Sequence, residues 1–326
     1  MDFDLRQRTI DLEVNRSRLE RALCSCELAL AELERRGDVD GLQRLRDDLR
    51  SALLLVDAAR NSVVARIRLG VEPLRVSFGE GKFWVVAPRA RTVFNIDPRT
   101  RKVRSLKLGK EPFDAATGGG ALWVADHDSQ RVMRVDLQTG AVTRSQDLGS
   151  PQLAVAYGFG AVWVVDANES LLRLDPATLE VTGSIEGVAS SHEGYEPKIA
   201  VAADAIWVSD ALKLAVARVD PQTLRVTYRR ALAGDGITAG AGAVWSADGR
   251  RSVWRFASGR ARRVPVGAGP IDVAAGSHSV WAVNSRGQTL VRISAADRRV
   301  VKRFPLGREP VAVAVGGGYV VAIVRF

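Results

Sequence analysis

A carboxylate or amide side chain recurs three positions after a tryptophan along most of the chain. The set comprises Asp126, Asp166, Asp210, Asp248 and Asn284. A second set stands immediately before a proline and comprises Glu72, Glu111, Glu196 and Glu309. Carboxylates gathered at one edge of a fold can hold Mg²⁺ or Ca²⁺, share protons or bind a cationic ligand. We therefore treat both sets as a ligand-binding rim, with Asp126 and Asp166 as candidate metal ligands.

The alternative for the aspartates is a structural one. Asp and Asn at the ends of strands commonly accept hydrogen bonds from local backbone N–H groups and so cap turns. For each aspartate taken alone, turn capping is the favoured interpretation. The set as a whole would still make one rim acidic against a basic background.

Two histidines are candidates for acid–base chemistry, because imidazole titrates near neutral pH. His127 stands between Asp126 and Asp128. His192 belongs to the segment Ser190–Glu196, which also holds Tyr195 and is the one insertion in the spacing of the tryptophans. This segment could overhang the rim as a lid. A surface histidine is more often inert, so both catalytic roles are hypotheses, and His278 is expected in a turn.

The elements that position these residues are repeats. Trp84, Trp123, Trp163, Trp207, Trp245 and Trp281 each open an apolar run, and Tyr319 is assigned to the same place in the last unit. The successive spacings are 39, 40, 44, 38, 36 and 38 residues. A period near 40 with short, turn-separated, β-rich runs is typical of the four-stranded blades of a β-propeller.

Each unit divides into four strands. In the second unit, the first strand follows Pro112, the tryptophan strand follows Gly118–Gly120, and the third strand is Val132–Asp136. Up-and-down connectivity puts the loops before strand one and after strand two on one rim, here called the top. The other loops form the bottom rim. Both carboxylate sets and His127 therefore belong to the top rim.

The two ends of the repeat region predict how the ring closes. The last unit, 310–326, supplies only an inner pair of strands, and 62–70 reads as a fourth strand without its first three. Together they make a composite blade, predicted to be three-stranded, which leaves no open sheet edge. The sequence thus predicts a mainly β protein with a seven-bladed propeller over 61–326. A six-bladed ring would leave two apolar strands unpaired.

Residues 1–60 differ in kind and predict an α-helical hairpin. Leu5, Leu12, Leu19, Cys26 and Leu33 recur every seven residues in a coiled-coil-like stripe. Gly37–Gly41 breaks the pattern, and a second helix would carry Leu42, Leu45, Leu49, Leu53 and Val56. The apolar faces need a further surface, either the propeller or a second copy of the chain. Self-association is slightly favoured, so a homo-oligomer is expected.

Charge and composition narrow the partners and the location. The net charge is +10; residues 1–60 hold 11 basic and 13 acidic residues, so the excess lies in the propeller. A basic flank is expected at the bottom rim, formed by Lys82, Arg99, Arg101, Lys102, Arg225, Arg260, Arg298 and Arg299. Nucleic-acid binding would call for exposed aromatics among them, whereas the tryptophans are expected to be buried, so nucleic acid is not an expected partner.

No signal peptide, membrane span, nucleophile elbow, phosphate-cradling loop or His/Cys metal cluster is recognised in the sequence. Cys24 and Cys26 stand two apart in a helical pattern, so they diverge around the helix and are expected to be reduced thiols. A cytoplasmic location without membrane contact is therefore expected.

The unit Gly-x-x-Pro…Gly-x-Gly-x-x-Trp-Val…Val-x-Arg-Val-Asp-Pro-x-Thr resembles two related propeller groups over about residues 62–326. They are the YVTN surface-layer-type repeat family and the streptogramin (virginiamycin B) lyase-like group. The resemblance implies a propeller fold. For the lyases it implies a magnesium-assisted elimination that opens a cyclic depsipeptide, with histidines after the strand-one proline and acidic residues three positions after the tryptophan.

This chain departs from the lyase pattern in one half of that site. The positions after the proline are Leu74, Phe113, Gln152, Lys198, Ile271 and Val311, and none is histidine. The positions after the tryptophan match in acidity. We therefore expect a non-catalytic scaffold that binds a protein or small ligand at the top rim; no cofactor is certain, and Mg²⁺ or Ca²⁺ is possible. The alternative is a lyase or hydrolase that uses Mg²⁺ or Ca²⁺ with the top-rim carboxylates and His127 or His192.

Overall fold

Seven four-stranded antiparallel sheets account for the described part of the chain, which in this computed structural model is residues 51–190, 196–231 and 234–325. Most of the predicted helical hairpin, together with His192 and Tyr195, lies outside the described residues. Residues 51–326 form one compact unit. Among the described residues, no helix is long and apolar enough to span a membrane.

Six sheets, blades 1 to 6, are each built from consecutive strands. Blade 1 holds β3 (Arg75–Gly79), β4 (Lys82–Ala87), β5 (Thr92–Ile96) and β6 (Val103–Lys107). Blade 2 holds β7 (Pro112–Gly118), β8 (Ala121–Asp126), β9 (Arg131–Asp136) and β10 (Val142–Arg144). Blade 3 holds β11 (Gln152–Gly158), β12 (Ala161–Asp166), β13 (Leu171–Leu174) and β14 (Val181–Ile185).

The next three blades repeat this order. Blade 4 holds β15 (Lys198–Val201), β16 (Ile206–Asp210), β17 (Ala215–Val219) and β18 (Val226–Arg230). Blade 5 holds β19 (Ile237–Gly240), β20 (Ala243–Ala247), β21 (Ser252–Ala257) and β22 (Arg260–Pro265). Blade 6 holds β23 (Pro270–Ala275), β24 (Ser279–Asn284), β25 (Thr289–Ser294) and β26 (Arg299–Pro305).

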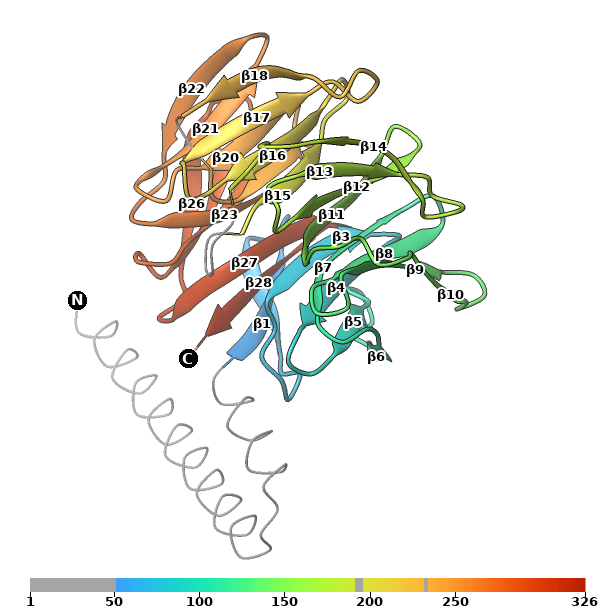
Figure 1. Ribbon diagram of the computed structural model, residues 1–326. Helices are drawn as coiled ribbons and strands as arrows, with labels where there is room; N and C mark the ends of the chain where they lie inside the picture. Colours follow the sequence, from blue (N-terminus) through green and yellow to red (C-terminus); the bar gives the residue numbers. More distant parts are fainter. Residues whose placement is uncertain (1–50, 191–195, 232–233, 326) are drawn as a thin grey trace, which may run out of the picture. The chain divides into compact units, whose positions relative to one another are not determined.

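The first strands of the blades contact one another in a closed circuit, from β3 through β7, β11, β15, β19 and β23 to β27 (Glu309–Gly316) and back to β3. Figure 1 shows the sheets fanned around these strands. The prediction of a seven-bladed β-propeller is confirmed.

Burial explains why each blade has this order. The tryptophan strands are buried over their whole length, as in β8 and β12, because sheets cover both of their faces. The fourth strands, such as β10, are exposed. Most hairpins between strands one and two place two successive residues at positive φ, as at Phe159 and Gly160 (53° and 70°). That is the type I′ turn, which suits glycine and matches the strand twist.

The seventh blade corrects two sequence predictions. It has four strands rather than three, in the order β2 (Ser62–Ile67), β1 (Ser51–Asp57), β28 (Tyr319–Arg325), β27. Leu53 and Val56, assigned to the second helix, lie in β1, and the propeller begins at Ser51 rather than at 61. A short apolar run such as Ala52–Val56 cannot be distinguished by periodicity from a helical segment. The segment forms a strand because it is buried between two neighbouring strands, β2 and β28.

The register of the last hairpin corrects a third prediction. Trp123 pairs with Ala116 across β7 and β8, two residues before Gly118. In β27 and β28 the residue in that relation is Val321, which pairs with Ala314, while Tyr319 pairs with Gly316. Val321 therefore occupies the tryptophan position of blade 7, because the glycine run sets the register.

Candidate functional site

The aspartates that follow the tryptophans are buried and bind backbone N–H groups. Asp126 accepts from the N–H of Lys110 at 2.9 Å and of Glu111 at 2.6 Å. Asp210 accepts from Ser190 and Lys213, both at 2.9 Å. Each of these bonds ties the top end of a tryptophan strand to a neighbouring loop.

The other members of the set follow the same rule. Asp166 accepts from the Ser150 hydroxyl at 2.7 Å and from the Ser170 N–H at 2.8 Å. Asp248 accepts three N–H bonds, from residues 250–252, at 2.8–2.9 Å. Asn284 donates to Val266 O at 3.0 Å. The structure therefore favours turn capping for this set. A metal site at Asp126 and Asp166 stays a prediction, with their carboxylates engaged by donors in two separate blades.

The glutamates of the top rim lie in different surroundings. Glu72 forms ion pairs with Arg89 at 3.3 Å and Arg325 at 3.1 Å. Glu196 is half-buried, and Glu309 is exposed at the start of β27. Among the described residues, the one group of acidic and histidine side chains close enough to share a metal ion contains Glu111 and none of these three glutamates.

Glu111 instead converges with His127 and Asp128. His127 Nδ1 lies 3.0 Å from a Glu111 oxygen and 3.2 Å from an Asp128 oxygen, and ligand atoms of all three lie within 4.8 Å of one another. Burial, followed by the neighbouring Asp128, raises the pKa of Glu111. The hydrogen bond from His127 lowers the pKa of Asp128. Two residues singled out in the sequence, Glu111 and His127, thus meet in blade 2, together with Asp128.

An aromatic contact links this cluster to the centre of the ring. The rings of His127 and Phe113 have centroids 5.4 Å apart. The Arg75 guanidinium lies 5.2 Å from the Phe113 centroid, within the range of a cation–π interaction. Phe113, the residue after the strand-one proline of blade 2, therefore connects the rim to the channel.

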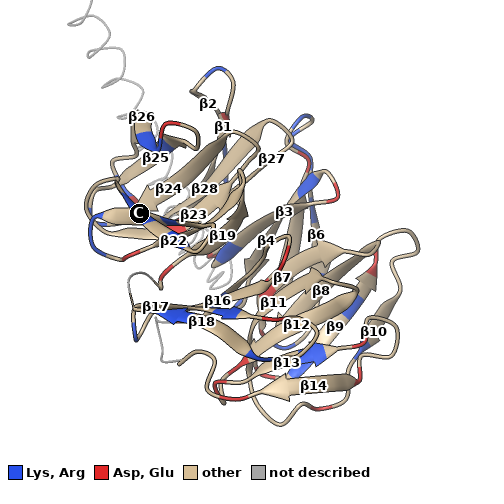
Figure 2. Ribbon diagram, turned by 90° about the horizontal axis from the view of Figure 1, so that it is seen from above, with Lys and Arg blue, Asp and Glu red and all other residues tan. Residues whose placement is uncertain are grey.

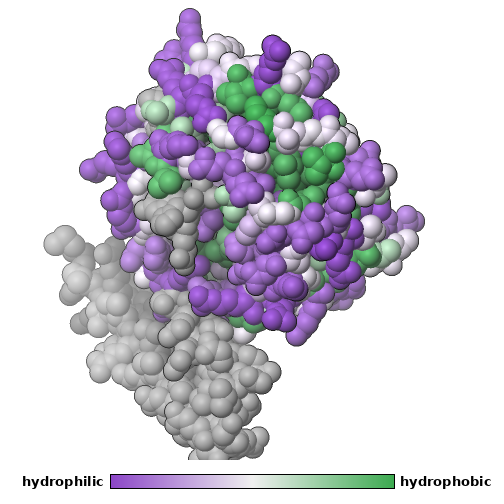
Figure 3. Space-filling model, in the orientation of Figure 1, coloured by the Kyte–Doolittle hydropathy of each residue, from purple (hydrophilic) through white to green (hydrophobic). Residues whose placement is uncertain are grey.

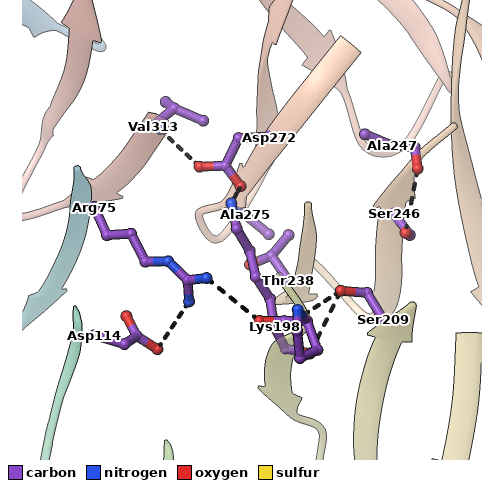
Figure 4. A network of polar contacts seen from close by, with 11 residues as sticks. Arg75, Asp114, Lys198, Ser209, Thr238, Ser246, Ala247, Asp272, Ala275 and Val313 are labelled. Atoms are coloured by element: carbon purple, nitrogen blue, oxygen red, sulfur yellow. Dashed lines mark hydrogen bonds and ion pairs between the residues drawn. The ribbon is translucent and has the colours of Figure 1, made fainter. Parts of the chain in front are cut away.

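The first strands of all seven blades line a central cavity of about 350 Å³. Its charged residues are Arg75, Asp114, Lys198 and Asp272, shown in Figure 4. Arg75 pairs with Asp114 at 3.4 Å, and Lys198 pairs with Asp272 at 2.7 Å. Arg75 also donates to Pro197 O at 3.5 Å, so it reaches from blade 1 to blade 4.

The two acids of these pairs also bind the neighbouring blade. Asp114 accepts from Val155 N–H at 3.0 Å and Asp272 from Val313 N–H at 2.9 Å. Burial raises the pKa of Asp114, and Arg75 opposes that rise. The cavity is lined elsewhere by small, apolar and aromatic residues, including Ala156, Tyr157 and Ala314. The charges thus stand at the top end of the first strands, near the mouth of the channel.

One further acid, Asp235, interacts electrostatically with the cavity residues Lys198 and Asp272 and was not singled out in the sequence analysis. Asp235 precedes β19, and its carboxylate makes no recorded hydrogen bond or ion pair with another described residue. Burial raises the pKa of Asp235 to about 6, with Lys198 opposing and Asp248 and Asp272 adding to the rise. The unit lacks the strand-one proline that marked the other blades, so nothing in the sequence pattern drew attention to this position.

The paired charges were also missed. Arg75, Asp114 and Asp272 each stand two positions after a strand-one proline, and Lys198 stands one after. These regular positions could have identified the four residues as neighbours in the channel, since first-strand residues face the channel. Over the whole propeller, Figure 2 shows basic and acidic residues mixed among the loops and strand ends.

Comparisons with known proteins show that the fold is shared with solved structures. Residues 74–169 match a family described as a repeat of unknown function (DUF6923). No curated protein matches the chain. The chain is similar to hydrazine synthase of Kuenenia stuttgartiensis, with a TM-score of 0.63, 14% identity and coverage of 78% of this chain and 95% of that one. It is also similar to BamB of Moraxella catarrhalis, with a TM-score of 0.54, 15% identity and coverage of 82% and 89%.

Both likenesses are likenesses of fold. Identities of 14% and 15% carry no residue-by-residue correspondence of sites.

Proposed function

We propose that this propeller is a non-catalytic binding scaffold whose channel mouth receives a cationic group from a protein partner or small ligand. The observation that carries the proposal is Asp235. The cations at the mouth, Arg75 and Lys198, each face an acid of their own. Asp235, beside Lys198 and Asp272, has no ion pair with another described residue. An ammonium or guanidinium group would supply the missing partner.

The proposal predicts a pH dependence. Because the pKa of Asp235 is about 6 in the folded protein, the carboxylate is ionised above that pH and protonated below it. Binding of a cation should strengthen as pH rises through about 6. The free protein should respond in the opposite sense: a pKa raised above 3.8 means that the folded state holds the proton more tightly, so the contribution of Asp235 to stability is lost as pH rises through 6.

Thermal unfolding with two short peptides tests this site, because a ligand of the folded state raises its stability. We expect acetyl-Gly-Arg-Gly-amide to raise the melting temperature at pH 7.5, less so at pH 5, and acetyl-Gly-Glu-Gly-amide to leave it unchanged. Asp235→Asn should remove the shift, whereas Asp297→Asn, at an exposed turn of blade 6, should keep it. Equal shifts from both peptides, or a shift that survives in Asp235→Asn, would refute the proposal.

A second candidate, a metal-assisted lyase or hydrolase, is favoured by the convergence of Glu111, His127 and Asp128. Two carboxylates suit Mg²⁺ or Ca²⁺, and they suit Mn²⁺ as well. A divalent cation held by these three side chains would act as a Lewis acid. The His127 ring, already within reach of both carboxylates, could exchange a proton at Nδ1 when no cation holds that atom.

Thermal unfolding in the presence of Mg²⁺, Ca²⁺ or Mn²⁺ separates the two candidates. If the metal site exists, one of these ions raises the melting temperature, and the rise disappears in Glu111→Gln/Asp128→Asn but persists in Asp126→Asn/Asp166→Asn. Loss of the rise only in the second variant would return the site to the aspartates. If none of these ions raises the melting temperature, the metal-assisted function is refuted and the binding scaffold is retained.

We also propose that residues 1–50 mediate self-association. The described propeller starts at Ser51, so a chain beginning at residue 51 keeps β1, whereas one beginning at 61 loses it. Light scattering should report a smaller oligomer for residues 51–326 than for the full chain. The same oligomeric state for both would assign the assembly to another surface.

A further inference from the structure

The junction between blades 4 and 5 differs from its equivalents around the ring. At the bottom end of the first strand, a glycine of one blade makes room for a side chain of the next. The pairs are Gly79 with Thr117, Gly118 with Tyr157, Gly158 with Val201, Gly240 with Ala275, Gly276 with Val315 and Gly316 with Phe78. At the junction of blades 4 and 5 the corresponding residues are Ala202 and Ala239. As at Gly240 and Ala275, no large side chain of the described residues stands at this place, and here the glycine is replaced as well.

The hairpin of blade 4 has a different turn for a chemical reason. Type I′ turns need two residues at positive φ, and most blades supply a glycine there. Blade 4 has Ala203 and Asp204, neither of which is at positive φ. The hairpin carries a bond from the Ala202 N–H to Ala205 O at 2.9 Å, and the blade 6 hairpin has the equivalent bond from Gly276 to Ser279 O and likewise no positive φ at Ser277 or His278.

The changed hairpin leaves an indole N–H without an acceptor. In four blades the tryptophan Nε1 donates to the carbonyl of the glycine five residues earlier, at 2.9–3.2 Å: Trp84, Trp123, Trp163 and Trp245. The Nε1 of Trp207 is buried and has no hydrogen-bond partner. Trp207 is 8% exposed, against 1% for Trp123. A buried donor without an acceptor destabilises the fold. Trp207 Nε1 therefore needs a hydrogen-bond acceptor that the described residues do not supply.

A cavity of about 740 Å³ occupies the junction. Its walls are aromatic on one side: the Trp207 ring lies 5.8 Å from the Tyr228 ring and 5.7 Å from the Phe256 ring, measured between centroids. The remaining lining is mostly small, including Ala202, Ala239, Gly240, Gly242, Ala243, Ala257 and Gly259. This volume lies in the range of pockets that hold small molecules. The face of the propeller seen in Figure 3 is largely hydrophilic and carries separate apolar patches.

The mouth of the cavity carries a net positive charge. Arg218 pairs with Asp204 at 2.9 Å. Arg260 also lines the cavity, is exposed, and has no recorded ion pair with a described residue. The two arginines and one aspartate therefore leave one guanidinium free to bind an anion.

We propose that the groove between blades 4 and 5, on the bottom rim, binds a flat aromatic small molecule that carries an anionic group. The ring system would lie against Trp207, Tyr228 and Phe256, and the anion would face Arg260. A hydrogen-bond acceptor on the ring would satisfy the Trp207 N–H after a small shift of that side chain. This site is separate from the channel mouth, which opens on the other rim, and does not depend on the function proposed there.

Isothermal titration of the full chain with 2-naphthoate, with 2-naphthalenemethanol as its neutral analogue, tests the proposal. Both are expected to bind, and tryptophan fluorescence should change on binding. Arg260→Gln should weaken naphthoate by about two- to fivefold, the value of an exposed charge pair, and leave the neutral analogue unchanged. Arg298→Gln, an exposed bottom-rim arginine at another blade, is the matched control.

A plugged variant locates the site. Ala202→Gly/Ala239→Tyr rebuilds at this junction the glycine–tyrosine pair of Gly118 and Tyr157. It should abolish binding of both compounds while the cooperative thermal transition is kept. Tyr228→Ala removes one wall without filling the cavity and should weaken both compounds about tenfold or less. Absence of binding to the wild type at millimolar concentration, or binding that survives in the folded plugged variant, would overturn the proposal.

Discussion

The junction of blades 2 and 3 and the junction of blades 4 and 5 are built from equivalent strands, but the first is packed with side chains and the second contains a cavity. In the first, the Tyr157 ring stacks parallel to the Trp123 ring with centroids 5.8 Å apart, and Gly118 leaves the space for it. In the second, Ala239 stands where the tyrosine would be, and the junction is hollow. A propeller can therefore convert a core contact into a pocket by replacing a glycine–tyrosine pair with two alanines.

The largest effect expected from this comparison comes from removing the tryptophans. Trp123→Ala empties a close-packed junction and should lower the free energy of unfolding by about 3–5 kcal/mol. Trp207→Ala should cost less, since one side of that ring already borders a cavity. Urea denaturation at equilibrium measures both. Equal losses would mean that the hollow junction is as tightly packed around its tryptophan as the filled one.

A smaller effect should come from adding one methyl group at the filled junction. A Cβ on Gly118 would overlap the Tyr157 ring, so Gly118→Ala should destabilise the protein by about 1–3 kcal/mol. The double variant Gly118→Ala/Tyr157→Ala reproduces the alanine pair of blades 4 and 5.

Because the two residues touch, their effects should not add. The methyl group should cost much less in the Tyr157→Ala background than in the wild type. Additive losses in a double-mutant cycle, followed by urea denaturation, would show that the glycine serves the turn and not the ring contact.

The smallest effect isolates the indole N–H. Trp245→Phe removes a donor bound to Gly240 O at 3.2 Å, whereas Trp207→Phe removes a donor that has no partner. Trp207→Phe should therefore be milder by about 1 kcal/mol. Thermal unfolding of the two variants under matched conditions provides the comparison. A milder effect at Trp245 would show that the Trp207 N–H is satisfied in solution.

The sequence predicted the ring because its signal is periodic. Six tryptophans at intervals near 40 residues predicted six blades, and the seventh followed from joining the last unit, 310–326, to the strand at 62–70. The prediction failed where periodicity does not distinguish a strand from a helix. Ser51–Asp57 was assigned to a helix, since a run of five apolar residues fits either element, and only its pairing with β28 distinguishes them.

The candidate site was less predictable, because it depends on contacts between distant residues. Asp126 was singled out and lies on the top rim, with its carboxylate engaged by loop N–H groups. The pairs Arg75–Asp114 and Lys198–Asp272 join different blades, and no local pattern reveals such a pairing. The hollow at blades 4 and 5 is an absence of side-chain volume, which a motif search does not detect.

The composite blade has a mechanical consequence. Ser51 pairs with Arg325 and Asp57 with Tyr319, so β1 and β28 run antiparallel with residues 51 and 325 at the same end. A force that pulls these two ends apart loads the hydrogen bonds of the pair one after another, as in opening a zipper. The closure that joins the two ends of the propeller is therefore the place where tension would open the ring first, and at low force.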